Sequence, residues 1–218
     1  VTEPFNNVLA LACPGGASDP CDPASPYFDR LQFGGNAQAT DVEIITVNIV
    51  NGPDIKTDGL DFTLRYGLDA GPGYLTFDLS GTQILGYDIG AWTFGGDYDA
   101  LGRLNYRTSL ARTLAEYKGR FTTNYQVGDL NARWVVNYLH DYTYNDQDGT
   151  DGTVDSHVTH DVHLNYSLMD GQLELIASAI NLGDEDPPFM SREMNYDALS
   201  HNAFGRILRV GFQYNMGQ

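Results

Sequence analysis

The sequence predicts an all-β fold of antiparallel strands, and among all-β folds it favours a segment of a transmembrane β-barrel. From about residue 58 onward, apolar and polar residues alternate with a period of two. This period is typical of strands, because successive side chains of a strand lie on opposite faces of a sheet. Short and long connections also alternate along the chain. No apolar run reaches the roughly 18–20 residues that a transmembrane helix needs.

The alternation defines most of the predicted strands. In residues 60–68, for example, leucine and aromatic residues alternate with polar residues or glycine. An apolar run at residues 173–180 forms a further strand, and residues 42–50 are either a separate strand or continuous with the first one. We therefore expect about seven or eight strands, each with one apolar and one polar face. The remaining alternating segments are residues 75–80, 120–127, 130–138, 158–168 and 208–216.

The connections between the predicted strands are of two kinds. Three are rich in Gly and Asp and are typical of tight hairpins: residues 67–73, 127–130 and 169–172. Three are long: residues 87–116, 142–156 and 183–204. Transmembrane β-barrels have this pattern, with short periplasmic turns and long extracellular loops.

The two faces of the predicted strands differ in chemistry. The apolar faces carry aromatic residues near strand ends, as the interfacial girdles of membrane barrels do. A soluble β-sandwich remains the alternative, because a half-exposed soluble sheet also alternates apolar and polar residues. The polar faces carry charges that a water-filled interior tolerates and a dry core does not: Arg65, Arg120, Arg133, Asp161 and Arg209.

Composition excludes two classes of protein. The 218-residue chain has a formal net charge of −17, whereas binding to nucleic acid requires clustered Lys and Arg. Hydrophobic residues make up 42% of the chain and charged residues 19%, so the chain is not a disordered acidic tail. We expect no nucleic-acid partner.

The two cysteines, Cys13 and Cys21, flank a short loop rich in Gly, Pro and Asp. A disulfide between them is expected, which implies an oxidising compartment. The alternative is a pair of free surface thiols. Residues 1–40 are interpreted as an extracellular loop region tied by this disulfide.

The longest connection contains candidate ligand-binding residues. Aromatic and adaptable polar side chains capture sugars, peptides or chelates by stacking and hydrogen bonding. The alternative is that these aromatic residues pack the loop onto its neighbours. The candidates are Trp92, Phe94, Tyr98, Arg103 and Tyr106.

Residues 145–152 resemble a calcium-binding loop in composition, with Asp146, Asp148 and Asp151 as candidate ligands. The segment lacks the spacing of an EF-hand, because its Gly comes too early and no Glu stands at the twelfth position. A solvated loop tip is the main interpretation, and weak binding of external calcium is the alternative. No other cofactor is expected.

Three histidines, His157, His160 and His163, lie in one predicted strand. His157 and His163 share a face with Asp161, whereas His160 points to the other side, so the three cannot converge on a metal. They are interpreted as part of a hydrated polar wall, with ligand or metal binding as the alternative. The Asp-Ser-His at residues 155–157 point apart along a strand and form no catalytic relay. We expect no enzymatic activity.

Residues 181–189, Asn-Leu-Gly-Asp-Glu-Asp-Pro-Pro-Phe, resemble the segment that leaves the penultimate strand of TonB-dependent outer-membrane receptors. Residues 51–68 and 102–105 resemble further segments of that family. The resemblance covers roughly residues 40–216 and concerns the C-terminal part of the receptor. Additional matches are Tyr196-Asp197, His201-Asn202 and Gly205-Arg206.

Two positions depart from the family pattern. Gly183 stands where Phe is usual. Barrels of this type usually end on an aromatic residue that the assembly machinery reads. Here that C-terminal signal is carried by Val210, Phe212 and Tyr214, and the signal is imperfect because four residues follow Tyr214.

The resemblance implies that residues 41–218 are the last strands of a larger barrel, which has 22 strands in outer-membrane transporters. We expect that the plug domain is absent from this chain. The implied function is import of a scarce nutrient (siderophore, cobalamin, oligosaccharide or peptide) across the outer membrane of a Gram-negative bacterium. The implied partners are the rest of the receptor, TonB acting through the plug, outer-membrane lipid and the nutrient. The alternatives are a secreted β-sandwich that binds carbohydrate or acts as an adhesin, and an independent eight-stranded barrel.

Overall fold

The computed structural model describes residues 5–15, 19–49, 51–91, 97–105, 112–145, 151–191 and 194–215. The chain is all-β and its long strands are antiparallel, which confirms the predicted fold class at that level. It divides into two compact units. The first consists of Val1–Ile55 and Ile89–Tyr98, and the second of Lys56–Asp88 and Asp99–Gln218.

The first unit is a small disulfide-tied structure. Its elements are the helix α1 (Phe5–Ala12), the 3-10 helices η1 (Phe28–Arg30) and η2 (Ala39–Asp41), and the antiparallel strands β1 (Leu31–Phe33) and β2 (Val42–Ile45). The predicted disulfide is present. Its two half-cystines belong to a core that also contains three apolar side chains: Val8, Ala12 and Leu31.

The helix α1 was not expected from the sequence. Eight residues are too few to display a helical period, and an isolated helix of this length is marginal in water. Val8 and Ala12 of α1 are fully buried, so packing stabilises the helix in this unit. In the described part of the chain, no helix is long and apolar enough to cross a membrane.

The second unit contains an eight-stranded antiparallel sheet. Its long strands follow the order β14-β13-β12-β9-β8-β4-β3, and the two-residue β5 (Tyr98–Asp99) pairs with β4. β2 lies outside this sheet, so residues 42–45 are a strand separate from the first long one. The long strands are β3 (Ile55–Ala70), β4 (Gly73–Ile89), β8 (Tyr117–Val127), β9 (Leu130–Leu139), β12 (His157–Leu168), β13 (Leu173–Ile180) and β14 (Ile207–Tyr214).

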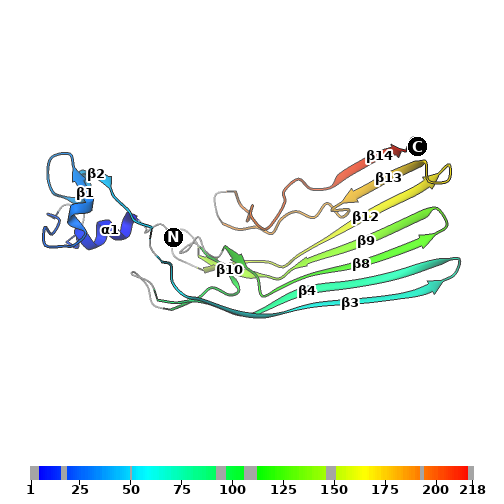
Figure 1. The fold of residues 1–218 in the computed structure, drawn as a ribbon, viewed down its shortest axis with the longest axis horizontal. Coiled ribbons are helices and arrows are strands. Elements are labelled where there is room, and N and C mark those ends of the chain that lie inside the picture. Colours follow the sequence, from blue (N-terminus) through cyan, green and yellow to red (C-terminus); the bar gives the residue numbers. More distant parts are fainter. Residues whose placement is uncertain are drawn as a thin grey trace. The chain divides into compact units, whose positions relative to one another are not determined.

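The tight hairpins lie together at one end of this sheet, here called the hairpin end (Figure 1). They join β3 to β4, β8 to β9 and β12 to β13, as predicted. Gly71 and Gly128 have φ of 59° and 51°, a left-handed conformation that glycine adopts at no steric cost. The three long connections leave from the opposite end, here called the loop end.

The long connections are not irregular throughout, because parts of them form a second sheet. Its order is β11-β10-β6-β7, with a parallel β10–β6 pair and antiparallel pairs elsewhere. The strands are β6 (Arg103–Leu104), β7 (Thr113–Leu114), β10 (Tyr142–Asn145) and β11 (Asp151–Val154). A hydrophobic core joins all three connections: Leu104, Ala115, Tyr142, Tyr144, Val154 and Met190.

The apolar face of the long sheet is exposed. Leu64, Val210 and Phe212 have 64%, 90% and 74% of their surface exposed. Aromatic side chains on this face contact one another across strands, with ring centroids 6.1 Å apart for Phe77 and Phe121. Within the second unit, the core cluster of the described residues is formed by the long connections and contains no side chain of this face.

The sheet is open along both outer edges. Among the described strands, β3 pairs only with β4 and β14 only with β13. The described strands therefore form an open sheet rather than a closed cylinder. Val210, Phe212 and Tyr214, the residues of the predicted C-terminal signal, lie on the edge strand β14.

Candidate functional site

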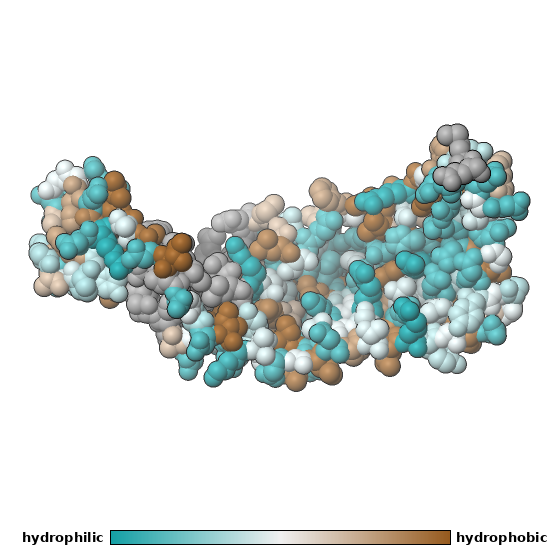
Figure 2. Space-filling view, in the orientation of Figure 1, coloured by the Kyte–Doolittle hydropathy of each residue, from teal (hydrophilic) through white to brown (hydrophobic). Residues whose placement is uncertain are grey.

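The polar face of the long sheet is the most distinctive surface of the second unit. Figure 2 shows that hydrophilic residues dominate the visible face over the long strands. Two of the hollows on this polar face matter most here, one over the hairpin-end halves of β3, β4, β8 and β9 and one at the loop end. They are here called the central hollow and the rim cavity.

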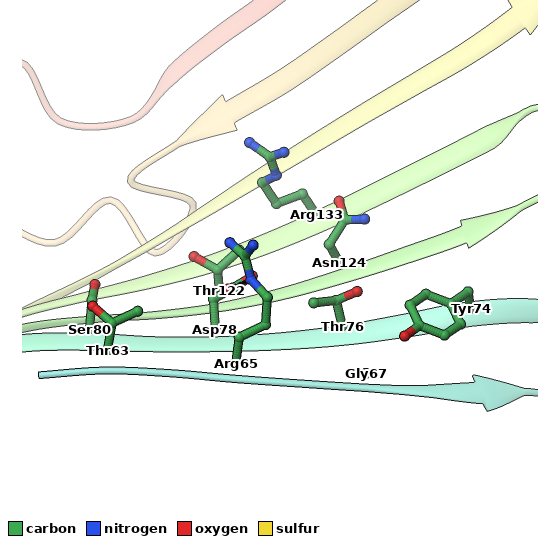
Figure 3. Close-up of a pocket in the computed structure, with 10 residues that line it drawn as sticks. All are labelled: Thr63, Arg65, Gly67, Tyr74, Thr76, Asp78, Ser80, Thr122, Asn124 and Arg133. Atoms are coloured by element: carbon green, nitrogen blue, oxygen red, sulfur yellow. Dashed lines mark hydrogen bonds and ion pairs between the residues drawn. The ribbon is translucent and has the colours of Figure 1, made fainter.

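The central hollow has a volume of about 600 Å³. Figure 3 shows its side chains projecting from β3, β4, β8 and β9 to the same side of the sheet. The Arg65 guanidinium pairs with the Asp78 carboxylate. Its lining residues are Thr63, Arg65, Gly67, Tyr74, Thr76, Asp78, Ser80, Thr122, Asn124 and Arg133.

Arg133 and Asn124 lie directly opposite each other on β9 and β8. The Oδ1 atom of Asn124 is buried and accepts no hydrogen bond from the described residues. An arginine beside a series of hydroxyl and amide groups is a surface that binds water or a polar ligand, and it is unsuited to an apolar core. Of the charges predicted on the polar face, Arg65 and Arg133 line this hollow, Arg120 and Asp161 line the rim cavity, and Arg209 lines neither.

The rim cavity has a volume of about 330 Å³ and lies where the long strands meet their connections. That volume is at the lower end of the range for small-molecule sites, about 300–1,000 Å³. Most of its lining groups are uncharged hydrogen-bonding side chains. The polar lining residues are Arg120, Asn137, Tyr138, His157, Thr159, Asp161, Asn181, Ser200, His201 and Asn202.

A chain of hydrogen bonds crosses three strands beneath the rim cavity. Arg120 Nε donates to Asn137 Oδ1 at 3.0 Å, and Asn137 Nδ2 donates to Asp161 Oδ2 at 3.0 Å. The other carboxylate oxygen, Asp161 Oδ1, accepts the backbone N–H of Asn181 at 2.9 Å. These bonds link β8, β9 and β12 to the end of β13, so the polar wall has a defined geometry.

Asn181 shapes the exit of the chain from β13. Its φ is 52°, and Asn adopts this left-handed conformation more readily than most residues. Its amide donates to the Glu185 carbonyl at 2.9 Å and accepts the Glu185 N–H at 3.0 Å. No heavy atom lies within 4 Å of a Cβ added at Gly183, so the position is open.

A buried carboxylate, Asp197, holds the connections together at the loop end. Asp197 is 3% exposed. Its Oδ2 accepts hydrogen bonds from Thr113 Oγ1 at 2.6 Å and from the Tyr142 hydroxyl at 2.9 Å. Its Oδ1 accepts the Leu199 N–H at 3.0 Å. Each of the three long connections therefore contributes to one polar network.

These hydrogen bonds determine the ionisation of Asp197. Burial acts to raise the pKa of its carboxyl group. The hydrogen bonds from Thr113, Ser200, Tyr142 and the Leu199 N–H outweigh burial and lower the pKa below its ordinary value. Asp197 is therefore a carboxylate near neutral pH, and it accepts rather than donates.

Two histidines extend the network to the rim of the long sheet. His201 Nε2 lies 3.2 Å from the Tyr142 hydroxyl. His201 Nδ1 lies 3.0 Å from Nδ1 of His157, the first residue of β12. Burial lowers the pKa of His201, the charge of His157 lowers it further, and Asp197 opposes both effects. Both histidines line the rim cavity.

The ligand-binding residues predicted from sequence are not brought together by the described structure. Trp92, Phe94 and Tyr106 lie outside the described residues. Tyr98 lies in β5 and Arg103 in β6, and neither lines either hollow. Their proposed contact with ligand stays a prediction.

The candidate calcium ligands are also largely outside the description. Asp146 and Asp148 are not described, and Asp151 is the exposed first residue of β11. Within the described ranges, no group of three or more His, Cys, Asp or Glu residues is placed to hold a metal ion. Calcium binding at the loop tip stays untested.

The predicted separation of the histidines in β12 agrees with their contacts. His160 stacks on Trp134 of the apolar face, with ring centroids 5.7 Å apart. His163 contacts Ser178 Oγ at 3.1 Å on the polar face. His157 instead finds its partner in His201, which the sequence pattern did not indicate.

Sequence reasoning did not identify the residues of the polar network as a site. Asp197 and His201 entered only as matches to a family segment, and Tyr142 only as the start of a long loop. The partners Thr113 and Asp197 are 84 residues apart, so no local spacing could bring them to attention. The available signal was the presence of Asp and His in an otherwise loop-like segment.

Comparison with known proteins adds no identification. No family model, no curated protein and no solved structure matches the chain. The functional argument therefore depends on the geometry of the two faces, the open edges and the rim cavity.

Proposed function

We propose that the chain is part of a TonB-dependent outer-membrane transporter and supplies strands of its barrel wall together with loops that bind the nutrient. The main supporting observation is a single-layer sheet with an exposed apolar face and a polar face. In water, a large contiguous apolar surface is unfavourable and uncommon on monomeric proteins. Contact of this face with lipid would avoid the free-energy cost of exposing it to water.

The lengths of the strands support this proposal. β8, β9 and β12 contain 11, 10 and 12 residues. A tilted strand that crosses the hydrocarbon layer needs about 9–11 residues. β3 and β4 are longer, with 16 and 17 residues, and would extend beyond the lipid.

The open edges support a larger barrel. An unpaired edge strand exposes N–H and C=O groups, and these must be satisfied within the hydrocarbon layer. Further strands beside β3 and β14, from the rest of the receptor, would pair them. A 22-stranded barrel with a plug is the arrangement that the family resemblance implies.

The ligand is proposed to bind on the polar side near the loop end, which would be extracellular, with the hairpin end periplasmic. The rim cavity supplies a small, polar and ordered site there. Trp92, Phe94, Tyr98, Arg103 and Tyr106 remain candidates for the outer part of this site. TonB would act through the plug, and the nutrient would then pass along the hydrated interior.

The β-sandwich alternative receives less support from the packing. A sandwich buries its apolar face against a second sheet at a spacing of about 10 Å. Phe62, Trp134 and Phe212 are 40%, 42% and 74% exposed in the second unit. These are the side chains that a sandwich core would cover.

Cysteine labelling of neighbouring residues on β12 tests the proposal. Leu164 lies on the apolar face and Asn165 on the polar face. Both chain cysteines are in the disulfide, so a new cysteine is the only free thiol. In intact outer membranes, we expect Asn165→Cys to react with a water-soluble maleimide and Leu164→Cys to react only with a lipid-soluble one.

Equal reaction of both variants with the water-soluble reagent would contradict the proposal, because both faces would then contact water. Recovery of the protein in the soluble fraction without detergent would also contradict it. Each variant serves as the control for the other, since the two positions are adjacent in one strand.

A further inference from the structure

The most unusual group of side chains in the described structure is the pair of facing histidines at the rim cavity. We propose that His157 and His201 form an acid-released latch, which holds the connection between β13 and β14 over the rim cavity. The pair is T-shaped, with ring centroids 4.9 Å apart. The effect of the latch on a bound nutrient rests on the proposed function, whereas the pH-dependent contact between the two histidines does not.

Hydrogen-bond counting assigns the protons of the latch. The Tyr142 hydroxyl donates its single proton to the Asp197 carboxylate, a charge-assisted bond. The phenolic oxygen then accepts from His201, whose Nε2 must carry a proton. His201 Nδ1 is therefore unprotonated, and it accepts from Nδ1–H of His157. Every bond is satisfied when both imidazoles are neutral.

An additional proton disturbs this arrangement wherever it binds. On His201 Nδ1, it would face the Nδ1–H of His157 across 3.0 Å, and the bond between the rings would be lost. On His157 Nε2, it would enter a buried position that has no hydrogen-bond partner among the described residues. Protonation of both rings would place two positive charges in contact.

Several charged groups surround the pair and set the balance. Burial lowers the pKa of His201, and the negative charge of Asp197 on the same connection opposes this effect. Glu185, after β13, is the carboxylate that acts on His157. Arg120 on β8 and Asp161 on β12 line the same cavity and carry opposite charges. The carboxylates of Asp197 and Glu185 therefore reduce the free-energy cost of protonating the pair. They do not remove the repulsion between two Nδ1–H groups that face each other.

The sign of the pH dependence follows from these contacts. The released connection binds protons with the ordinary histidine pKa of about 6.5, whereas burial lowers the pKa of His201 in the latch. The released form therefore takes up more protons as the pH falls below about 6.5. The latch is fully stable above that pH and weakens as the pH falls towards the lowered value.

Release of the latch would alter the cavity directly. Ser200, His201 and Asn202 form one side of it, and they belong to the connection that the latch holds. The His201 N–H also donates to the Asp197 carbonyl at 3.0 Å, so the turn and the latch move together. Acid would open this side of the cavity and weaken the hold on a bound ligand.

Hydrogen exchange in the purified full-length protein tests the latch without any ligand. Peptides covering residues 194–206 are compared between about pH 7.5 and about pH 5.5, on either side of the ordinary histidine pKa, after correction for intrinsic exchange rates. In the native protein, we expect opening of this segment to increase severalfold in acid, because the released connection binds protons more readily than the latch does.

Two variants each remove one of the two imidazoles and keep part of the hydrogen bonding. In His157→Asn the side-chain amide can replace the Nδ1–H donor, and in His201→Gln it can replace the Nε2–H donor to Tyr142. His201→Gln should exchange equally at the two pH values, and His157→Asn, which keeps the buried His201, should show a smaller response than the native protein. His163→Asn is the control, because His163 lies on the same strand and face but contacts Ser178. It should retain the full response to pH.

The latch is disproved if the native segment exchanges equally at both pH values, or if a folded His157 or His201 variant retains the native response. The outcome is independent of the labelling experiment on β12. An acid response in a protein whose two faces are equally wetted would retain the latch and remove the transporter proposal. The reverse result would remove the latch alone.

Discussion

At the scale of single residues, Asp197 determines how the three long connections meet. A buried carboxylate is costly unless its oxygens accept several hydrogen bonds. Here the donors come from β7, β10 and the turn after Asp197 itself. The same bonds orient the Tyr142 hydroxyl and hence the proton on His201. One anion thus organises a network that extends to the rim cavity.

Replacement of Asp197 by Asn should loosen this network. Hydrogen bonds to a charged group contribute about 1.5–3 kcal/mol each, and the neutral amide can accept through only one atom. We expect the free energy of opening of residues 194–206 to fall by about 2–3 kcal/mol, measured by hydrogen exchange near neutral pH. Asp129→Asn in the β8–β9 hairpin should have no effect on this segment. A change of the same size in both variants would exclude a specific role for Asp197.

At the scale of elements, the strands were predictable and the contacts of the connections were not. A period of two is local, so the alternation in β9 and β12 also determined their faces, with Arg133 and His163 directly opposite on the polar side. The hairpin at Gly128 was predictable for the same reason. In contrast, Tyr142 and His201 meet across 59 residues, and no short-range pattern encodes that contact.

The disulfide is expected to stabilise the first unit alone. It closes a loop over a sequence separation of eight residues, which corresponds to about 2–3 kcal/mol in the chain-entropy model. Two of the five buried residues described in the core of this unit are the half-cystines themselves. In the double variant Cys13→Ser and Cys21→Ser, we expect protease cleavage within residues 5–49 to increase by at least about tenfold, as for the loss of about 1.4 kcal/mol.

Cleavage within the long sheet provides the internal control for that experiment. The half-cystines lie in the first unit, so β8, β9 and β12 should resist protease equally in the native protein and in the double variant. Increased cleavage in both units would show that the disulfide stabilises more than its own core. Unchanged cleavage in the first unit would show that α1 and the β1–β2 pair are stable without it.

At the scale of the second unit, the exposed apolar face and the unpaired edge strands are both unfavourable in contact with water. β14 has neighbours on one side only, and its apolar residues are among the most exposed in the described chain. An edge of this kind is an aggregation hazard in water. Within a membrane barrel, lipid covers the face and a further strand covers the edge. Charge placed on either face of β14 therefore distinguishes the two environments.

Val210→Arg and Gln213→Arg place the same charge on opposite faces of β14. An arginine facing lipid near the middle of a bilayer costs about 2–4 kcal/mol, and less near the interfaces. At position 213 the new cation lies opposite Glu174 on the polar face, where water and a carboxylate accommodate it. We expect Val210→Arg to reduce the amount of folded protein in the outer membrane severalfold and Gln213→Arg to leave it unchanged, measured by heat-modifiable migration in gels. Equal yields would mean that Val210 contacts water, and the lipid-facing assignment of this surface would then be wrong.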